Sequence, residues 1–318
     1  MGVAHSNKLL ALVSRSFAVC IPRLPKVVRQ DVGNFYLLCR FADSIEDSKL
    51  SLQQKERYFK RFRMVLKKED PIALKKLTNE LLPFIWDKHD IQLVNQFEPV
   101  LKEFSGLNPK AKKIALKWLK EMVWGMNEYS QREIKTFLEL NKYCYYVAGT
   151  VGFYLTDLFV YKFKLTGQQA LKKSAEEFGL LLQKVNIIRD FSKDFSQGRV
   201  FWPRQLFEKY GIKVERVFEP QNEEKRKLIL EEMVVDAKKH VQASVEYIKR
   251  LPAELKGLRT FCAIPLFMAL PTLALCEGNP KVFEQNEKVK LSRTETIQII
   301  HNINRHVQSD AFLEQNAH

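Results

Sequence analysis

The chain has 318 residues and a formal net charge of +15, from 52 lysine and arginine residues against 37 aspartate and glutamate residues. Hydrophobic residues make up 46% of it, enough to build a sizeable core or an apolar cavity. The charge suits nucleic acid, an anionic membrane surface or an anionic small molecule, but the absence of zinc-finger, RNA-recognition and basic-zipper patterns disfavours nucleic acid.

Signals for strands and linkers are scarce. No Asn-Gly or Asp-Gly turn lies between alternating apolar runs, and the segments rich in leucine, lysine and glutamate repeat at helical spacing. No Ser/Gly-rich or Pro-rich stretch divides the chain. These patterns predict an all-α protein with a single domain over residues 1–318.

The cysteines and the N-terminus indicate a cytoplasmic protein. The apolar run Leu9 to Val13 is too short for a signal peptide. The five cysteines are scattered, and no pair has the spacing of metal ligands, so we expect buried, reduced thiols. They are Cys20, Cys39, Cys144, Cys262 and Cys276.

The first candidate site residues follow a short predicted helix over Asn7 to Leu12. The sequence SRSF (Ser14 to Phe17) begins a turn-like stretch that Pro22 and Pro25 end. Its Ser14, Arg15 and Ser16 offer hydrogen-bond donors suited to a diphosphate, and arginine matches phosphate geometry well. The alternative interpretation is a helix cap beside a surface arginine.

A first acidic helix is predicted from about Gln30 to Ser48. Because each helical residue turns the chain by about 100°, Tyr36, Arg40, Asp43 and Asp47 share one stripe, with Glu46 close beside it. Asp43 and Asp47 are like charges one turn apart, which destabilises an ordinary helix. Amphipathic scaffold helices then follow over Ser51 to Lys68, Pro71 to Asp87, Ile91 to Phe104 and Ala111 to Tyr129.

The segment Tyr143 to Phe159 has an unusually small face. Ala148, Gly149 and Gly152 contribute almost no side-chain volume, so another group can approach the backbone closely. Tight helix packing is one interpretation; a kinked helix beside a long apolar ligand is the one we favour. Tyr143 is a polar group placed just before this surface.

A second acidic stripe lies in QKVNIIRDFSKDFSQGRVFWP (Gln183 to Pro203). On one continuous helix, its polar stripe consists of Gln183, Asn186, Asp190, Asp194 and Gln197. The flanking residues are apolar almost all round, which predicts a buried helix. Buried carboxylates need a partner, and Mg²⁺ is commonly held by carboxylates and substrate phosphates. The alternative is a solvated acidic face paired with Arg40 or Arg189.

Together the two stripes predict acidic walls that face each other across a cavity, with metal and diphosphate between them. After the second stripe, Arg199 could lie over a diphosphate. Phe201 and Trp202 would pack either a closing loop or the core. Arg204 to Gly211 and Gln221 to Arg250 are further predicted scaffold helices.

The longest apolar run, Phe261 to Cys276, has 16 residues and two prolines, Pro265 and Pro271. A membrane span needs about 20 residues, so we predict a helix of the core or of the cavity wall. The ring of Phe261 could stabilise a carbocation; ordinary core packing is the alternative.

Several stretches of this chain resemble the squalene/phytoene synthase family. DSIED (Asp43 to Asp47) and DFSKD (Asp190 to Asp194) resemble its two aspartate-rich motifs. SRSF, YCYYVAGTVG (Tyr143 to Gly152), the Gln183–Pro203 stretch and FCAIP (Phe261 to Pro265) are similar to the squalene synthases within it. The matches span about residues 14 to 293 in the family's order.

The resemblance implies an isoprenoid-synthase helical fold with a central cavity and a Mg²⁺-dependent prenyltransferase. Its activity would join two farnesyl diphosphates into presqualene diphosphate and reduce this with NADPH to squalene. Tyr143 would transfer a proton or stabilise a cation. The implied metal ligands are Asp43, Glu46, Asp47, Asp190 and Asp194. The implied diphosphate-binding residues are Ser14, Arg15, Ser16, Arg40, Arg189, Arg199, Gln183 and Asn186. The implied pocket residues are Phe17, Tyr36, Ala148, Gly149, Gly152, Phe261 and Pro265.

Cofactor binding is implied by EKVKLSR (Glu287 to Arg293). Lys290 matches a basic position of the family, but Ser292 stands where a second basic residue is expected, with Arg293 one residue on. Asn186 and Arg189 would complete the NADPH contacts. A product that forms without NADPH (presqualene diphosphate or dehydrosqualene) and a phytoene synthase are the enzymatic alternatives; a basic nucleic-acid-binding or scaffold protein is the non-enzymatic one.

The family's eukaryotic squalene synthases end in a membrane anchor, whereas this sequence stops at His318 without one. That departure predicts a bacterial-type enzyme that is soluble or attached to the inner membrane only peripherally. The sequence does not fix the oligomeric state, and a monomer is our expectation.

Overall fold

The computed structural model describes residues 2–129, 132–284 and 288–317, and within them all side chains except those of residues 2–5, 7, 15 and 16. Every regular element in these ranges is a helix, which confirms the predicted all-α class. The chain forms two compact units, residues 1–131 with 153–168 and residues 132–152 with 169–318. A single domain over residues 1–318 stays a prediction.

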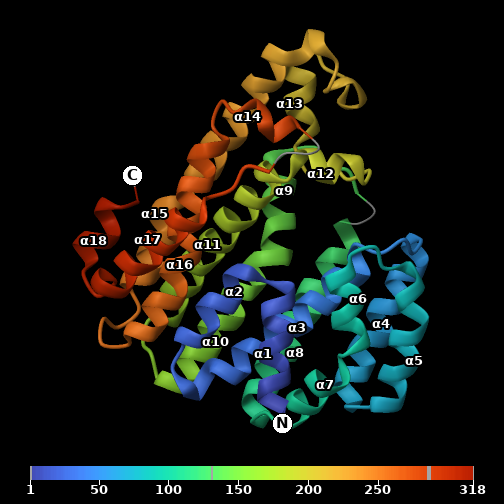
Figure 1. Ribbon diagram of the computed structural model, residues 1–318, viewed down its shortest axis with the longest axis vertical. Coiled ribbons are helices and arrows are strands. Elements are labelled where there is room, and N and C mark those ends of the chain that lie inside the picture. The colour runs from blue at the N-terminus through green and yellow to red at the C-terminus, as the bar shows by residue number, and fades with distance from the viewer. Residues whose placement is uncertain (1, 130–131, 285–287, 318) are drawn as a thin grey trace. The chain divides into compact units, whose positions relative to one another are not determined.

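The first unit contains most of the N-terminal half of the chain (Figure 1). Its α-helices are α1 (Gly2–Val13), α2 (Arg15–Cys20), α3 (Lys26–Glu46), α4 (Leu52–Lys68), α5 (Pro71–Leu81), α6 (Lys88–Asn95), α7 (Glu98–Ser105), α8 (Pro109–Tyr129) and most of α10 (Thr150–Phe163). Short 3-10 turns cover η1 (Ile21–Arg23) and η2 (Leu82–Phe84).

Helix α3, which carries the first acidic motif, is the centre of this unit. It packs against α1, α4, α6, α7 and α8. Its inner face is apolar, and the ring of Phe41 contacts the rings of Phe62 and Phe97 with centroids 4.4 and 4.3 Å apart. The Tyr154 hydroxyl donates to the carbonyl of Asp31 across 2.9 Å. The polar stripe is therefore built on a helix that its apolar face holds in place.

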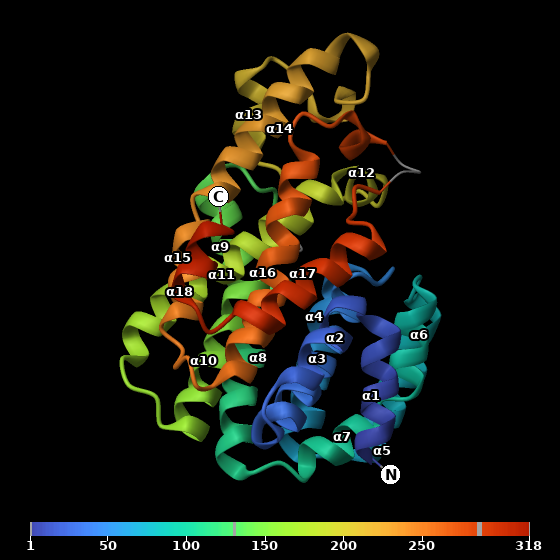
Figure 2. The same cartoon turned by 60° about the vertical axis from the view of Figure 1, so that its left-hand side comes forward.

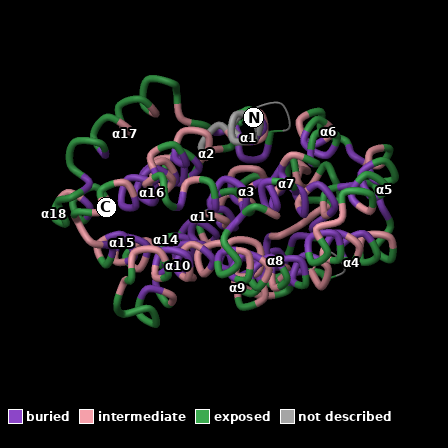
Figure 3. Tube along the Cα trace, turned by 90° about the horizontal axis from the view of Figure 1, so that it is seen from below, coloured by how far each residue is buried: buried purple, intermediate pink, exposed green. Residues whose placement is uncertain are grey.

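The second unit contains the C-terminal half. Its elements are α9 (Phe137–Cys144), the π-helical turn η3 (Tyr145–Gly149), α11 (Gln168–Arg189), α12 (Phe191–Ser196), α13 (Arg204–Lys209), η4 (Val214–Arg216), η5 (Pro220–Asn222), α14 (Glu223–Lys238), α15 (Val241–Lys249), α16 (Lys256–Cys276), η6 (Pro280–Phe283), α17 (Arg293–His306) and α18 (Asp310–Gln315). Helices α16 and α17 lie side by side (Figures 1 and 2). Helix α17 is mostly exposed (Figure 3).

Helix α16 is longer than the sequence suggested. It begins at Lys256, before the apolar run, and has 21 residues with Pro265 and Pro271 inside it. In length and composition it could cross a membrane, so the prediction that it is too short was wrong. However, 67% of its most apolar window is buried inside the protein, as expected of a core helix.

One predicted turn and two other predicted helices differ from the structure. SRSF is not turn-like: Ser14 caps α2, and its hydroxyl accepts from the amide of Phe17 at 3.0 Å. The predicted Ile91–Phe104 helix is two helices, because Pro99 lies in the first turn of α7 and cannot continue α6. The predicted Gln221–Arg250 helix is interrupted before α15.

The second acidic stretch is also interrupted. Helix α11 ends at Arg189, and α12 begins at Phe191. Asp190, between them, has φ −99° and ψ 14°, outside the helical geometry that one continuous stripe requires. The predicted single stripe from Gln183 to Gln197 is therefore wrong: Gln183 and Asn186 belong to α11, and Asp194 belongs to α12.

The small face around Gly149 packs against α11. A Cβ atom on Gly179 would lie 2.6 Å from the backbone nitrogen of Gly149, and one on Gly152 would lie 2.5 Å from the carbonyl oxygen of Ala175. The π-helical turn replaces ordinary α-helix just before Thr150. Tight helix packing therefore accounts for the small residues Gly149 and Gly152. This was the interpretation that we did not favour from the sequence.

We expect Gly179→Ala to destabilise the second unit. The added methyl group meets main-chain atoms that cannot swing aside, and overpacking of this kind costs about 1–3 kcal/mol. The melting temperature should fall clearly for this variant. Gly106→Ala is the matched control, because its Cβ would meet its nearest atom at 3.5 Å, an ordinary contact. Equal melting temperatures for the two variants would contradict the close approach of the two backbones.

Candidate active site

The first acidic motif carries its own arginine. On α3, the Nη1 atom of Arg40 donates to Oδ2 of Asp43 across 3.1 Å. Its Nη2 atom donates to Oδ1 of Asp90 across 2.5 Å, and Asp90 is buried at the start of α6. The Arg40 Nε atom is buried without a hydrogen-bond partner in the described part of the chain. One guanidinium thus bridges two carboxylates, and its Nε–H group is left over as a hydrogen-bond donor.

Asp90 was missed by the sequence analysis. Asp87 is the N-cap of α6 and accepts from the amides of His89 and Asp90. A sequence of this kind, WDKHD, indicates a helix start, and nothing in it shows which aspartate turns inward. Only the packing of α6 against α3 brings Asp90 to Arg40.

Burial weakens the acidity of this motif. It raises the pKa of Asp43 to about 6; Arg40 opposes the shift, whereas Asp47 and Asp90 add to it. In the absence of a bound cation, Asp43 is therefore half-protonated near pH 6. Asp47 is exposed and Glu46 is half-buried. A divalent cation at this position would oppose the same desolvation that raises the Asp43 pKa.

Three further predicted residues lie beside this motif. The rings of Phe17 and Tyr36 are 4.8 Å apart between centroids. Burial raises the pKa of Tyr36 to about 12, while a hydrogen bond with Ser14 acts in the opposite direction. The structure thus brings Ser14, Phe17, Tyr36, Arg40 and Asp43 together within the first unit. The side chains of the predicted diphosphate ligands Arg15 and Ser16 lie outside the described residues.

The second acidic motif has two arginines. Arg189 forms a bidentate pair with Asp190, with Nε 3.1 Å from Oδ1. Arg199 donates from Nη2 to Oδ1 of Asp194 across 3.1 Å and to Oε1 of Gln197 across 2.6 Å. Burial tends to raise the pKa of Asp190, but the Arg189 guanidinium outweighs it, so the pKa lies below its usual value. Asp190 is therefore ionised across the neutral range.

The second motif is less buried than predicted. Asn186 and Gln197 are exposed, whereas Gln183, Asp190 and Asp194 are half-buried. The apolar flanks lie inward, and the polar side chains remain within reach of a ligand. Asp190 pairs with Arg189, as the alternative interpretation expected, whereas Asp194 pairs with Arg199, which that interpretation did not name. The expectation that this motif faces Asp43 and Asp47 concerns both units and stays a prediction.

Tyr143 stacks on Phe201. Tyr143 is 4% exposed, and the two ring centroids are 4.7 Å apart with an interplanar angle of 13°. The guanidinium carbon of Arg199 lies 5.9 Å from the centroid of Phe201. Trp202 is 1% exposed and donates to the Ile187 carbonyl across 3.2 Å, so it belongs to the core. The Phe201 ring thus links the tyrosine to the arginine of the second motif.

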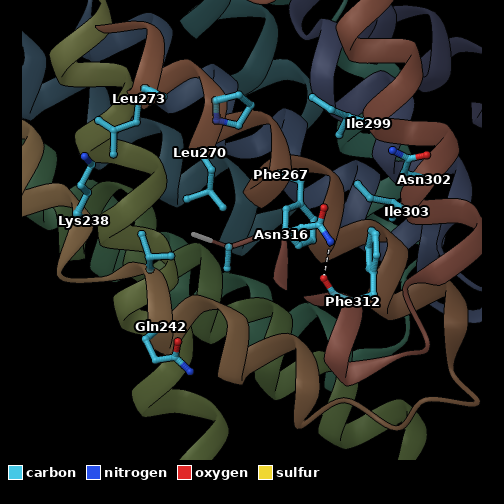
Figure 4. A pocket seen from close by; sticks show the side chains of 14 residues that line it. Lys238, Gln242, Phe267, Leu270, Leu273, Ile299, Asn302, Ile303, Phe312 and Asn316 are labelled. Atoms are coloured by element: carbon cyan, nitrogen blue, oxygen red, sulfur yellow. Dashed lines mark hydrogen bonds between the residues drawn. The ribbon is translucent and has the colours of Figure 1, made fainter. Parts of the chain in front are cut away.

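Helix α16 contributes to a pocket of about 820 Å³ in the second unit (Figure 4). The pocket is lined by α16 residues such as Phe267 and Leu270, and by Ile299 and Ile303 of α17 and Phe312 of α18. None of the predicted site residues lines it. Phe261 is buried and Pro265 is half-buried on the same helix. The pocket-lining roles of Phe261, Pro265, Ala148, Gly149 and Gly152 stay predictions.

Ser292 has a structural role. It is the N-cap of α17, where its hydroxyl accepts from the amide of Glu295 and the Glu295 side chain accepts from its amide. Such a capping box requires serine or threonine, which explains the absence of a basic residue. Lys290 and Arg293 are exposed on either side of it. Glu287, at the start of this stretch, lies outside the described residues.

The carboxylates of each motif, taken separately, suit a magnesium ion that completes its shell with substrate and water. No group of three or more His, Cys, Asp or Glu side chains that could hold a metal occurs among the described residues. Mg²⁺ usually takes only one or two protein carboxylates, keeps several waters and binds substrate phosphates. Asp43 and Asp47, one helical turn apart, and Asp190 and Asp194 offer such oxygens. The exposed Lys290 and Arg293 likewise fit the phosphates of a nicotinamide cofactor.

Comparison with known proteins identifies the family. Residues 10–295 match the model of the family described as squalene/phytoene synthase. The squalene synthase of Schizosaccharomyces pombe is 36% identical over 324 residues, which cover 98% of this chain and 67% of the yeast protein. That of Homo sapiens is 32% identical over 295 residues, 91% of this chain and 67% of the human protein.

Solved structures give the same result. The complex of TcSQS with the ligand BPH1237 has a TM-score of 0.86 and 31% identity, covering 99% of this chain and 90% of that one. A dehydrosqualene synthase has a TM-score of 0.65 at 19% identity, which shows a shared fold alone. With both aspartate motifs present and paired with arginines, this chain belongs to the squalene/phytoene synthase family.

Proposed function

We propose that this chain is a squalene synthase, which joins two farnesyl diphosphates head to head and reduces the presqualene diphosphate to squalene with NADPH. The observation that best supports this is the family match over residues 10–295. It includes both aspartate motifs, each with an arginine beside it: Arg40 by Asp43, Arg189 by Asp190 and Arg199 by Asp194. Carboxylates hold hard cations, and guanidiniums match the oxygens of a diphosphate. The relatives named squalene synthase support the same product.

The first step breaks the bond between the allylic carbon and the diphosphate oxygen, and the electron pair leaves with the oxygen. Bound Mg²⁺ supplies Lewis-acid stabilisation of that charge. The residues that would hold it are Asp43, Glu46, Asp47, Asp190 and Asp194. Arg40, Arg189 and Arg199 would bind the departing diphosphate, joined by Ser14, Arg15, Ser16, Gln183 and Asn186.

The second molecule's double bond then captures the allylic cation, and a proton is lost. Tyr143 or the departing diphosphate accepts that proton. Buried Tyr143 has its ring held by Phe201, which supports a fixed position for its hydroxyl. An apolar site matters because water would quench the cation to an alcohol; Phe17, Tyr36, Ala148, Gly149, Gly152, Phe261 and Pro265 would line it.

The second half-reaction ionises presqualene diphosphate and ends with the delivery of hydride. NADPH supplies that hydride when bound. The cofactor would be contacted by Asn186, Lys290 and Arg293. Arg189 would also contact it, after breaking one of its hydrogen bonds to Asp190. Compact phosphate charge is well matched by lysine and arginine. Because Ser292 caps α17, Arg293 is the residue that would supply the second basic contact.

We also propose that the protein is a cytoplasmic monomer that contacts the inner membrane peripherally. The five cysteines are free and buried, which suits a reducing compartment. The net charge of +15 suits an anionic lipid surface. No finding favours the dehydrosqualene, phytoene or nucleic-acid-binding alternatives.

Asp43→Asn should abolish most of the turnover while the protein stays folded. The substitution keeps the size of the side chain but removes the charge that holds the cation, and the loss of one such contact costs roughly 10²-fold in rate. Diphosphate release from farnesyl diphosphate and Mg²⁺ measures it. Asp70→Asn is the control, because Asp70 caps α5 and asparagine caps equally well. Near-parental turnover of Asp43→Asn, or full activity in EDTA, would contradict the metal site.

Tyr143→Phe should lower the rate of presqualene diphosphate formation or divert the products. The variant keeps the ring stack on Phe201 and removes only the hydroxyl, whose share in proton transfer is roughly 10²-fold or more. Tyr161→Phe, at an exposed tyrosine, is the control. A large fall in melting temperature with unchanged specific activity would assign Tyr143 to the core instead.

NADPH should convert accumulated presqualene diphosphate into squalene. Lys290→Ala should raise the NADPH concentration for half-maximal squalene formation by roughly tenfold, the value of one charged hydrogen bond. The first half-reaction should keep its rate. Lys256→Ala, at another exposed lysine of the same unit, is the control. If presqualene diphosphate or dehydrosqualene is the only product at saturating NADPH, the squalene assignment fails.

A further inference from the structure

A network of charged side chains connects α11, the helix before the second acidic motif, to α14 and to His240. Lys184 of α11 is 0% exposed, and its ammonium contacts Asp236 of α14 and, at 2.6 Å, Nε2 of His240. The other ring nitrogen, Nδ1, lies 2.6 Å from Oε2 of Glu177, also on α11. Asp236 additionally accepts from Lys239 across 3.1 Å. All five side chains belong to the second unit.

The hydrogen bonds assign the protons of the network. An ammonium group only donates, so Nε2 of His240 is the acceptor, and Nδ1 carries the proton that it donates to Glu177. His240 is then neutral. Two lysines balance two carboxylates, so the network has no net charge. The side chains of the network thus supply one another with hydrogen-bond partners. A buried polar cluster is stable only when its donors and acceptors are paired in this way.

The network and the reactive side chains lie on opposite faces of α11. At about 100° per residue, Glu177 lies roughly 20° from Lys184 around the helix axis, whereas Asn186 lies roughly 200° away. Gln183 is about 100° from Lys184, on the side of Asn186. Exposure agrees with this division: Lys184 is buried, Gln183 is half-buried and Asn186 is exposed.

The second contact of α11 is on the side of Asn186. Gly179 and Ala175 lie roughly 140° and 180° from Lys184, and they meet Gly149 and Gly152 at backbone distance. The glycine contact sets how closely α11 approaches the backbone at Gly149 and Gly152. The hydrogen bonds at Lys184 are directional and hold only at one rotation of the helix about its axis. The network therefore adds a directional constraint to the apolar packing of α11 and helps to determine which way its polar residues point.

We propose that Lys184 and Asp236 are positioning residues, which set the rotation of α11 and thereby aim Gln183 and Asn186 and place Asp190 at its end. A rotation of about 20° moves a side-chain tip at the helix surface by about 2 Å, for a radius of about 5–6 Å. Displacements of about 1 Å can cost roughly 10²-fold in rate. The proposal rests on the function proposed above for its rate measurement.

The test separates positioning from stability. Lys184→Met alone leaves Asp236 buried without its ammonium partner and should lower the melting temperature. Lys184→Met combined with Asp236→Leu removes both charges, a change that often preserves or raises stability. We expect the double variant to keep a melting temperature within a few degrees of the parent, while kcat for presqualene diphosphate falls at least tenfold. Lys184→Arg, which keeps the charge, should restore part of kcat.

The control is Lys238→Met, which removes a lysine that pairs with Glu277 at the surface of the same unit and should leave kcat unchanged. A well-folded double variant with parental kcat would overturn the proposal, as would a double variant that does not fold although Lys184→Met does.

A parent protein without any activity on farnesyl diphosphate would instead overturn the proposed function. In that case, hydrogen exchange still tests the positioning role. Amides of residues 183–189 should exchange at least tenfold faster in the double variant while those of α16 do not change. Unchanged exchange of residues 183–189 would overturn the positioning role.

Discussion

A carboxylate that leaves water must find a positive charge, and this requirement explains the polar part of both units. Asp43 and Asp90 share Arg40, Asp190 holds Arg189, and Asp194 holds Arg199. Each pair lies on or beside a helix whose other face is apolar and buried. The guanidiniums therefore do two things: they make the partly buried aspartates tolerable in the folded chain, and they remain as cations beside any anion that arrives.

The ion pairs with arginine differ in their effect on the pKa of the aspartates. Asp190, opposite a bidentate arginine, has a pKa below its usual value. Asp43 shares its arginine with Asp90 and is more affected by burial, so its pKa is raised to about 6. The two motifs have similar sequences, but the pKa of the aspartate is raised in the first and lowered in the second. In the proposed reaction the first motif gains more from a divalent cation, because a cation cancels a larger desolvation cost there.

Helical periodicity and motif composition predicted the all-α class, most helices and the residues around Arg40 and Arg189. They did not predict breaks that depend on one residue, such as the ends of α11 and α14, because periodicity continues across a single turn. Asp90 and Lys184 could not be found from local sequence either, since their partners lie 50 and 52 residues away. Ser292 was judged only as a missing basic residue; the structure shows that it caps α17.

The break at Asp190 places the two aspartates of the second motif in different structural elements. Asp190 terminates a helix of 22 residues, whereas Asp194 lies on a separate helix of six residues, followed by Gly198 at φ 74°. Two aspartates on one continuous helix would have a fixed spacing. Here the spacing depends on one non-helical residue, although the amides of Asp190 and Asp194 still donate to the carbonyls of Asn186 and Asp190, each across 2.9 Å. The separation of the two carboxylates is thus determined by the backbone conformation of Asp190 and not by helix geometry alone.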